Sequence, residues 1–304
     1  MRCFDTWDTE LTGAACVALG YFDGVHIGHR AVLARTAAAA HSMGCEAAVF
    51  TFTPPEGRAV KGKALLTQTE KLRRLAALGI DVCVCPPFEA FCGLTPEEFV
   101  RRVLAEHFGA RVVFCGENFT FGRDRAGNGD TLRALCGAMG IEAQAMPLTE
   151  WDGTPVSSTR IREALCAGDI PLVNAMLGEA YCIDLPVRHG KRLGTTLGFP
   201  TINQVYPAHM QLPREGVYAT EVLLNGRWLP GATGLGTRPT VSGQGVTCET
   251  FIADFSGELY GDQIAVRFRQ YLWPTQRFES LDALARMVRC AAEASRGIAA
   301  GEKE

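Results

Sequence analysis

Short apolar runs alternate with longer amphipathic segments through the first half of the chain. The apolar runs have the length of buried strands and lie at residues 16–19, 47–52, 81–85, 111–115 and 142–146. The segments between them show helical periodicity and lie at residues 30–43, 67–78, 96–108 and 131–139. Thr95 followed by Glu98 forms a capping box before the third of these helices. This alternation predicts a parallel sheet with helices on both faces, in which ligands bind beyond the carboxyl ends of the strands.

The pattern changes at about residue 182, where helical periodicity gives way to short strands between Gly and Pro turns. We expect strands at residues 217–224, 227–229, 247–255 and 263–271, and a last helix near residues 281–294. Two helices over residues 159–177 would join the halves. The pattern predicts an α/β protein with two domains: a Rossmann-like domain with a parallel sheet over residues 1–181, and a small antiparallel β-barrel with a terminal helix over residues 182–304.

The charge balance and the cysteine spacing exclude several classes of protein. Thirty Lys and Arg against 33 Asp and Glu give a net charge of −3, too little positive field to attract long nucleic acid. No apolar run has the roughly 18 residues that would span a bilayer. The 12 cysteines include no CxxC pair, and the chain starts without a signal-peptide pattern. We therefore expect reduced thiols and a cytoplasmic protein.

A glycine-rich segment with two histidines directly follows the first predicted strand. It reads GYFDGVHIGH, in which His26 and His29 flank Gly28 where a helix would begin. Glycines allow a phosphate to approach the backbone closely, and the amide groups of a helix start favour an anion. Two imidazoles on one phosphate would stabilise charge that develops at a transferring phosphorus. A pair of surface histidines in a turn is the other interpretation.

A second polar segment, SSTRIR at residues 157–162, has the composition of a helix start. Ser157 or Ser158 would cap the helix, and Arg162 would lie about one turn further on. Hydroxyl, amide and guanidinium donors of this kind hold a triphosphate, although an ordinary helix start has the same pattern.

The second half contains a loop with basic residues and three glycines, HGKRLGTTLGFPTIN at residues 189–203. Such a loop suits the cradling of phosphates, although its spacing is not that of a Walker A motif. Thr201 and Asn203 follow Pro200 on the same side of an extended segment. Their oxygens are ligands of the kind that Mg²⁺ prefers. An ordinary surface loop is the alternative.

Glu249 is a carboxylate on a predicted strand face that is otherwise apolar. Alternation places it with Phe251, Ala253 and Phe255. A charge there is unfavourable unless the carboxylate is paired, reaches solvent or is functional. If it reaches a substrate hydroxyl, it is placed to act as a general base.

The first-half motifs resemble those of the nucleotidyltransferase superfamily, whose signature is HxGH. GYFDGVHIGH, GENFTFG at residues 116–122 and SSTRIREAL at residues 157–165 are similar to the bifunctional riboflavin kinase/FAD synthetases. The resemblance implies transfer of AMP from ATP to FMN, with His26 and His29 as catalytic residues on the ATP phosphates. It also implies an ATP-binding set made up of Gly20, Phe22, Asp23, Gly24, Gly28, Asn118, Ser158, Thr159 and Arg162.

The second-half motifs resemble the kinase half of the same family. GFPTIN is similar to its PTxN motif, and CETFIADFSGELYG is similar to the segment that carries its catalytic glutamate. The resemblance implies that Glu249 activates the 5′-hydroxyl of riboflavin and that Thr201 and Asn203 bind Mg-ATP. The implied ATP- and flavin-binding set is Gly190, Lys191, Gly194, Gly198, Pro200, Thr201 and Asn203.

Four positions depart from the family pattern. Pro55 stands where a histidine is usual, Gly234 where an asparagine is usual, Trp273 where an arginine is common, and Leu185 where a glycine is usual. These departures put some ATP or flavin contacts in doubt and leave open that only one activity is retained.

Two other functional classes are alternatives to a bifunctional flavin enzyme. A class I aminoacyl-tRNA synthetase shares the HIGH signature, but its lysine-bearing partner loop has no counterpart in SSTRIR. A non-catalytic flavin-binding module would need neither the histidine pair nor Glu249. We therefore expect riboflavin, FMN, FAD and ATP as partners, with Mg²⁺ as cofactor, no nucleic acid and no membrane; a weak homo-oligomer stays open.

Overall fold

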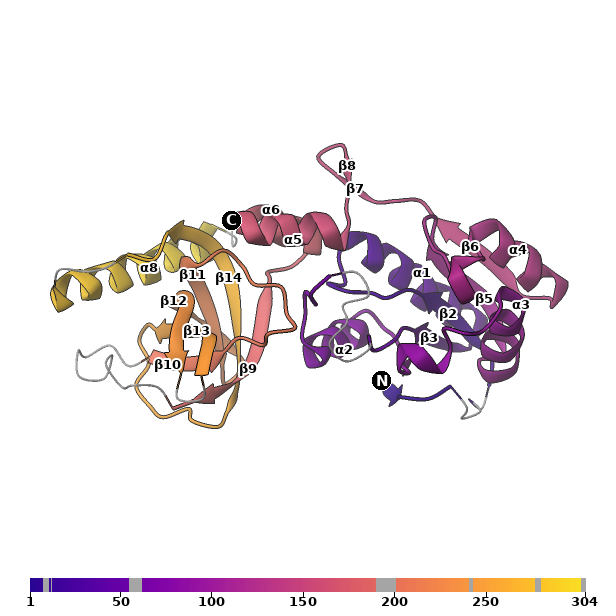
Figure 1. Ribbon diagram of the computed structural model, residues 1–304, viewed down its shortest axis with the longest axis horizontal. Helices are drawn as coiled ribbons and strands as arrows, with labels where there is room; N and C mark the ends of the chain where they lie inside the picture. The colour runs from indigo at the N-terminus through magenta and orange to yellow at the C-terminus, as the bar shows by residue number, and fades with distance from the viewer. Residues whose placement is uncertain are drawn as a thin grey trace. The chain divides into compact units, whose positions relative to one another are not determined.

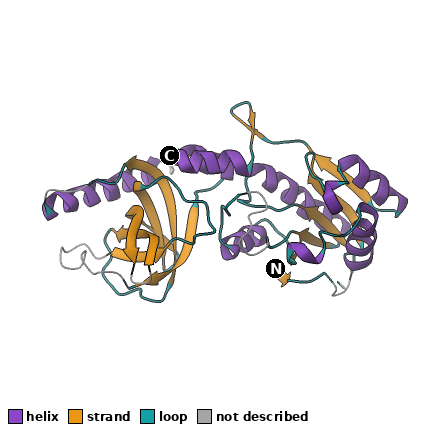
Figure 2. Cartoon of the chain, in the orientation of Figure 1, coloured by secondary structure: helices purple, strands orange, loops and turns teal. Residues whose placement is uncertain are grey.

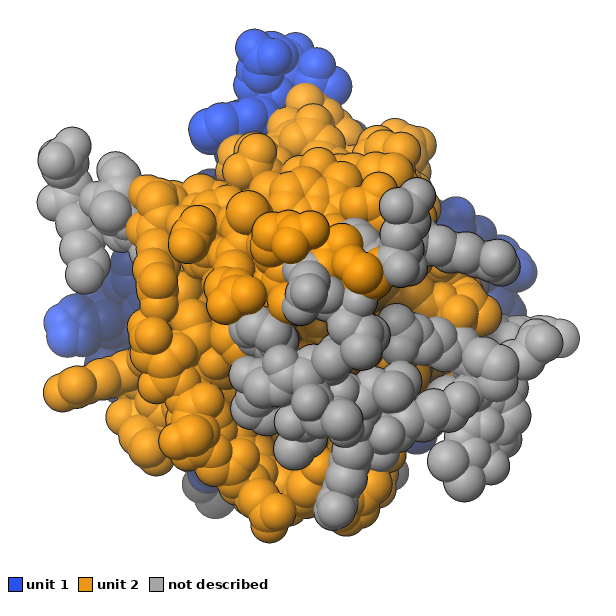
Figure 3. Space-filling model, turned by 90° about the vertical axis from the view of Figure 1, so that its left-hand side faces the viewer, with its two compact units in different colours: residues 1–62, 71–158 blue, residues 63–70, 159–304 orange. Residues whose placement is uncertain are grey.

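The computed structural model describes residues 1–7, 11, 13–54, 62–189, 201–240, 243–276 and 280–301. Figure 1 labels its helices and strands along the chain, and Figure 2 separates them by type. By its internal contacts the chain divides into two compact units, one of residues 1–62 and 71–158 and the other of residues 63–70 and 159–304 (Figure 3). The predicted domains are residues 1–181 and 182–304. This division stays a prediction, because a unit defined by internal contacts need not be a range that folds independently.

The first unit is built on a six-stranded sheet in which every neighbouring pair is parallel. The strand order is β1-β4-β3-β2-β5-β6. The strands are β1 (Arg2–Phe4), β2 (Ala15–Leu19), β3 (Glu46–Phe50), β4 (Val82–Val84), β5 (Ala110–Gly116) and β6 (Glu142–Met146). The predicted parallel sheet is confirmed. The edge strand β1 was not predicted, because its three residues form no apolar run.

Helices pack against this sheet, and one core cluster joins strand residues to two of them. The helices are α1 (Ile27–Met43), α2 (Gln68–Ala77), α3 (Pro96–Glu98), which continues as a wider helix at Phe99–His107, and α4 (Gly129–Ala138). Val17 and Val113 belong to a core cluster with Phe99 and Leu132, from the α3 continuation and from α4. The predicted capping box of Thr95 is present in full. Short elements complete the unit: Phe88–Ala90, Arg123–Arg125, and the hairpin of β7 (Glu150–Trp151) and β8 (Thr154–Pro155).

The second unit contains α5 (Ser158–Ala167) from its second residue on, α6 (Ile170–Leu177), a closed barrel and α8 (Leu281–Gly301). The barrel order is β10-β13-β12-β11-β14-β9. Its strands are β9 (Cys182–Arg188), β10 (Thr201–Val205), β11 (Gly216–Leu224), β12 (Arg227–Thr240), β13 (Gly243–Ile252) and β14 (Gln263–Trp273). The predicted antiparallel barrel with a terminal helix is therefore confirmed.

The strand bounds in the barrel differ from the predicted ones for physical reasons. β12 continues to Thr240 through glycines that resemble a turn in the sequence. At Gly231 a Cβ would lie 2.8 Å from the Phe251 carbonyl oxygen, so the close approach of two strands requires glycine there. β13 ends at Ile252, before Ala253 and Phe255, which were predicted to lie within the strand.

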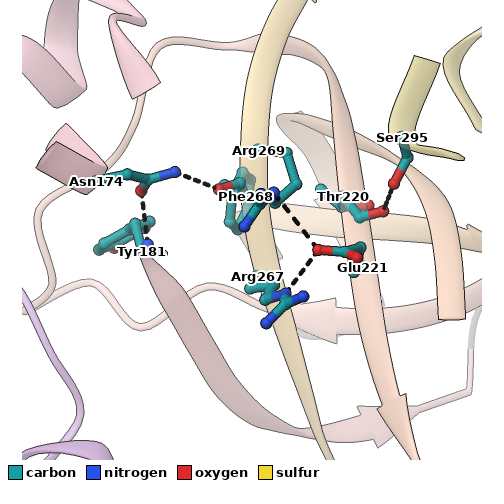
Figure 4. A network of polar contacts seen from close by, with 8 residues as sticks. All are labelled: Asn174, Tyr181, Thr220, Glu221, Arg267, Phe268, Arg269 and Ser295. Carbon is teal, nitrogen blue, oxygen red and sulfur yellow. Dashed lines mark hydrogen bonds and ion pairs between the residues drawn. The ribbon is translucent and has the colours of Figure 1, made fainter. Parts of the chain in front are cut away.

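Polar contacts join the neighbouring barrel strands β11 and β14 and link them to the helices α6 and α8 (Figure 4). The buried Glu221 carboxylate on β11 accepts from Arg267 Nε at 2.6 Å, and Arg269 Nε lies 3.4 Å from it, both from β14. Asn174 of α6 donates to the Phe268 carbonyl oxygen, and Ser295 of α8 donates to the Thr220 carbonyl oxygen. The two arginines give the buried Glu221 charge the partners that it needs, and the Asn174 and Ser295 hydrogen bonds tie α6 and α8 to the barrel wall.

The twelve cysteines lie within the described residues, and all are free thiols. Half of them are buried, and burial raises the pKa of Cys83 to about 12, which keeps that thiol protonated. Over the described ranges, the helices are too short or too polar to cross a membrane.

Candidate functional site

The predicted histidine segment lies at the point where the strand order of the first sheet reverses. From β2 the chain moves outward to β3 and β4, then returns to β5 on the other side of β2. Ligands of open parallel sheets bind beyond the carboxyl ends of the strands at such a point. The segment of residues 20–26 follows β2, and Asn118 follows β5 as an exposed side chain. The fold thus brings these two sequence-predicted candidates to neighbouring strand ends.

His26 caps helix α1 with its own imidazole. Its Nδ1 accepts the backbone N–H of His29 at 3.3 Å, and its ring is 6% exposed. Burial lowers its pKa from 6.5 to about 4, so the ring is neutral at neutral pH. Because Nδ1 is an acceptor, the single proton of the neutral ring lies on Nε2. His26 therefore offers a neutral N–H donor at the helix N-terminus, where the amide dipoles already favour an anion.

The ring of His29 stacks on that of His26, with centroids 3.6 Å apart and planes inclined by 18°. The His29 and Phe22 rings also form an edge-to-face pair, with centroids 5.3 Å apart. The stacking brings two imidazole side chains together at the N-terminus of α1, where the amide dipoles favour an anion. This arrangement favours a phosphate site over a pair of unrelated surface histidines.

The depressed pKa of His26 makes stability depend on pH. Between the ordinary pKa of 6.5 and about 4, the unfolded chain binds a proton at His26 and the folded chain does not. Stability is therefore complete above pH 6.5 and falls as the pH drops toward 4. From pH 7 to pH 5 the expected loss from this residue is about 2 kcal/mol.

Urea denaturation at the two pH values measures this loss. His26→Asn is the matched control, because its amide oxygen still accepts the cap bond but does not titrate. We expect the variant to lose about 2 kcal/mol less than the parent between pH 7 and pH 5. Equal losses in the two proteins would show that His26 has an ordinary pKa.

Gly28 packs tightly against the His26 ring. A Cβ at Gly28 would lie 3.2 Å from His26 Cε1 and 3.3 Å from Nδ1. Alanine suits a helix better than glycine, so Gly28→Ala should not unfold α1. It should instead push the His26 ring aside, and small displacements of a positioned group cost activity.

We expect Gly28→Ala to lower kcat/KM about tenfold for the AMP transfer to FMN that the family resemblance implies for the histidine segment. The rate of FMN formation from riboflavin, which the resemblance implies for the barrel, should stay unchanged when it is measured on the same preparation. Unchanged efficiency at both sites would mean that the His26 position does not matter for the reaction.

The loop before the histidines has a strained backbone. Phe22 and Val25 have φ of 52° and 46° without being glycine, and Gly24 has φ of 88°. Positive φ is unfavourable for a β-branched residue such as Val25. A Cβ at Gly20 would lie 2.9 Å from the Phe22 ring, so this glycine is also required. Asp23 is buried at 5% exposure within the same loop.

The serine segment is divided between the two units. α5 begins at Ser158, whose hydroxyl donates to the Asp23 carbonyl oxygen at 2.9 Å and so holds the histidine loop. Thr159 and Arg162 belong to the second unit, where Arg162 Nε donates to the Lys63 carbonyl oxygen at 2.7 Å. Contacts of these three residues with phosphate stay predictions. In the GENFTFG segment, Phe121 is a core residue and Phe119 stacks on it.

Thr201, Asn203 and Glu249 come together on the outer face of the barrel. Asn203 of β10 is directly opposite Glu249 of β13, and Thr201 is opposite Phe251. Directly opposed residues share a face, so their Cβ atoms lie about 5 Å apart. The neighbours Ile202, Cys248 and Thr250 are buried, whereas Thr201, Asn203 and Glu249 are half-buried. The three candidates therefore form one polar group with access from outside.

Two of the departures from the family pattern lie on the same face. Gly234 of β12 is the other direct neighbour of Glu249, and across β11 the row continues from Val217 to Trp273. Among the described residues, only the Glu249 carbonyl oxygen lies within 4 Å of a Cβ built at Gly234. Trp273 Nε1 donates to Met287 Sδ of α8 at 2.7 Å. Gly234 thus borders the candidate site, whereas Trp273 lies three strands away from Glu249 on the same face.

The other departures bear on the site differently. Leu185 is 5% exposed in the barrel core, so its side chain packs and does not reach a ligand. Pro55 lies outside the described residues. The same holds for five of the predicted kinase residues: Gly190, Lys191, Gly194, Gly198 and Pro200.

The oxygens on this face fit a magnesium ion. Thr201 contributes a hydroxyl and Asn203 an amide oxygen, with the Glu249 carboxylate on the adjacent strand. Mg²⁺ takes few protein oxygens and completes its octahedron with water and phosphate oxygens. Among the described residues no group of three or more His, Cys, Asp or Glu side chains is placed to hold a metal by itself.

Sequence reasoning missed two buried cations next to the histidine loop. Lys71 and Arg74 of α2 are 7% and 1% exposed and donate to backbone oxygens of residues 20–24. A lysine or arginine on a helix predicts an exposed position, so no signal in the sequence marked them.

Comparison with known proteins gives matches over both parts of the chain. A family model for FAD synthetase matches residues 8–160, and one for riboflavin kinase matches residues 177–298. A bifunctional riboflavin kinase/FMN adenylyltransferase of Pseudomonas fluorescens is 36% identical, covering 94% of this chain and 93% of its own. Its namesake of Escherichia coli K12 is 37% identical and covers 88% of each chain.

A solved structure described as a macrolide-efflux protein from Streptococcus pneumoniae has the same fold. Its TM-score is 0.85 at 26% identity, and the match covers 97% of this chain and 98% of that one. Fold, sites and matches together define a two-part enzyme of flavin nucleotide synthesis. The chain belongs to the bifunctional riboflavin kinase/FMN adenylyltransferase family.

Proposed function

We propose that the protein makes FAD from riboflavin in two ATP-dependent steps, one in each unit. The barrel phosphorylates riboflavin to FMN, and the parallel-sheet unit transfers AMP from ATP to FMN. The observation that carries the proposal is the presence of two separate polar constellations, His26 with His29 in one unit and Asn203 with Glu249 in the other.

In the adenylyl transfer, a phosphate oxygen of FMN forms a bond to the α-phosphorus of ATP. The bond from that phosphorus to the bridging oxygen breaks, and pyrophosphate leaves. His26 donates its Nε2 proton as a hydrogen bond to the phosphate oxygens, and His29 binds the same charge from the stacked position. Negative charge that develops in the transition state is thus held by prearranged donors and the α1 dipole.

The family resemblance implies further residues of the proposed ATP-binding set. Gly20, Phe22, Asp23, Gly24 and Gly28 would line the phosphates through the loop backbone. Asn118, Ser158, Thr159 and Arg162 would bind the rest of the nucleotide. The Ser158 hydroxyl already donates to Asp23, so toward a phosphate it would have to change partner or act through its amide.

In the kinase reaction, Glu249 accepts the proton of the riboflavin 5′-hydroxyl. That oxygen forms a bond to the γ-phosphorus of ATP, the bond to the β,γ-bridging oxygen breaks, and ADP leaves. Such reactions depend mainly on positioning and charge neutralisation. Thr201 and Asn203 would hold Mg²⁺, which when bound neutralises charge on the phosphates. Gly190, Lys191, Gly194, Gly198 and Pro200 would cradle the nucleotide.

The proposed partners are riboflavin, FMN, FAD and ATP. The near-neutral charge supports small anionic ligands held by local donors rather than a nucleic acid. The free thiols support a reducing compartment, which we propose to be the cytoplasm.

Incubation with riboflavin, ATP and Mg²⁺, followed by chromatography of the flavins, tests the proposed function. We expect FMN to appear first and FAD to accumulate after it. FMN without FAD would leave only the kinase, and FAD made only from supplied FMN would leave only the adenylyltransferase. The absence of both products from a folded protein would contradict the enzymatic function.

A further inference from the structure

The loop between β2 and α1 is held through its backbone carbonyl groups. Four consecutive carbonyl oxygens accept hydrogen bonds from fixed donors. The pairs are Tyr21 with Lys71 and Thr51, Phe22 with the Val25 amide, Asp23 with Ser158, and Gly24 with Arg74. A carbonyl group and the next amide lie in one peptide plane, so fixing the oxygens also fixes the directions of the following N–H groups.

Two of these donors are cations buried in α2. Lys71 Nζ lies 2.7 Å from the Tyr21 carbonyl oxygen and 2.8 Å from Thr51 Oγ1. Arg74 Nη1 lies 3.2 Å from the Gly24 carbonyl oxygen. Lys71 also packs over the Tyr21 ring, with Nζ 5.1 Å from the centroid. The two cations therefore hold both ends of the four-residue stretch.

Burying a cationic side chain carries a desolvation cost in free energy. Burial lowers the pKa of Lys71, which shows the cost of keeping its charge there, and the Asp23 charge offsets part of it. Aliphatic side chains would occupy the same volume of α2 with no desolvation penalty. The hydrogen bonds of the two cations to the loop carbonyl groups thus explain the buried charges better than packing does.

The loop that these two cations hold has a strained backbone. Phe22 and Val25 are buried and have positive φ, and such residues persist only where the surroundings impose the conformation. The segment leads directly into His26, whose ring must be in place to cap α1 and to donate from Nε2. If the carbonyl groups were released, the loop would relax and the direction of its amides would change.

We propose that Lys71 and Arg74 are positioning residues of the adenylyltransferase site, which hold the loop of residues 20–26 in the shape that binds the phosphates of a nucleoside triphosphate. They act through the Tyr21 and Gly24 carbonyl groups and do not touch the ligand. The proposal rests on the nucleotide-binding function proposed above for this loop.

Lys71→Met tests the proposal, because methionine matches the length of the stem and removes the charge and the donors. FAD formation is measured from FMN and ATP, without riboflavin, and FMN formation from riboflavin is measured on the same preparation. We expect the KM for ATP in FAD formation to rise at least tenfold, with kinase activity unchanged. The matched control is Arg73→Met, an exposed cation of the same helix, which should change neither value.

The separation of KM from kcat distinguishes positioning from a loss of folded protein. A smaller folded fraction lowers the apparent kcat and leaves KM as it was. An unchanged KM in Lys71→Met with intact kinase activity overturns the proposal. If that variant does not fold, Arg74→Lys decides, since it keeps the charge but not the guanidinium contact. We expect its KM for ATP to rise at least threefold, and no rise overturns the proposal. A parent protein that forms no FAD would instead refute the proposed function itself.

Discussion

Glu249→Gln is expected to lower FMN formation from riboflavin about a thousandfold while FAD formation from supplied FMN stays at the parent level. The substitution keeps the size and polarity of the side chain next to Asn203 but removes the group that accepts the hydroxyl proton. General bases contribute about 10² to 10⁴ in rate, and this residue has no carboxylate opposite it on either neighbouring strand to replace it.

Glu258→Gln is the matched control for this experiment. Glu258 is an exposed carboxylate beyond the end of β13, in the same short segment of sequence. Its replacement should change neither activity. Retention of more than about a tenth of kinase activity in Glu249→Gln would remove Glu249 from the role of general base.

His29→Ala is expected to have the reverse effect, a loss of FAD formation of about 10² to 10³ with FMN formation retained. The cap of α1 survives the change, because His26 accepts the backbone N–H of residue 29 and not its side chain. What is lost is the second imidazole, stacked at 3.6 Å on the first. The effect should therefore be on the reaction and not on the fold.

His41→Ala near the other end of α1 is the control, since His41 is exposed and lies in the last turn of the same helix. Product formation is followed by chromatography with FMN or riboflavin as the starting flavin. Equal loss of both activities in a folded His29→Ala protein would contradict two separate sites.

The sequence predicts those parts of the fold and site that depend on local pattern. Apolar runs and helical periodicity suffice for a parallel sheet, because its strands are buried on both faces. The histidine segment is contiguous, so its position at a helix start beyond a strand follows from neighbouring residues. The position of Asn118 at the adjacent strand end also depends on strand order, and the alternation of elements limits that order strongly.

The remaining features depend on contacts between distant parts of the chain. Glu249 meets Asn203 and Gly234 only through the register of three barrel strands, which no local pattern reports. The full length of β12 was not predicted, because its glycines resemble a turn in the sequence. The close approach of a neighbouring strand requires one of these glycines, Gly231. Lys71 and Arg74 resemble solvent-exposed helix residues until the fold places backbone oxygens against them.

The independence of the two sites is tested most directly by mixing two disabled proteins. With riboflavin, ATP and Mg²⁺, Glu249→Gln alone should form almost no FMN and thus no FAD, and His29→Ala alone should stop at FMN. The mixture should form FAD, because FMN made by the barrel of one protein is a substrate for the intact histidine site of the other. A mixture of folded proteins that stops at FMN, or a single variant that makes FAD from riboflavin, would contradict the account.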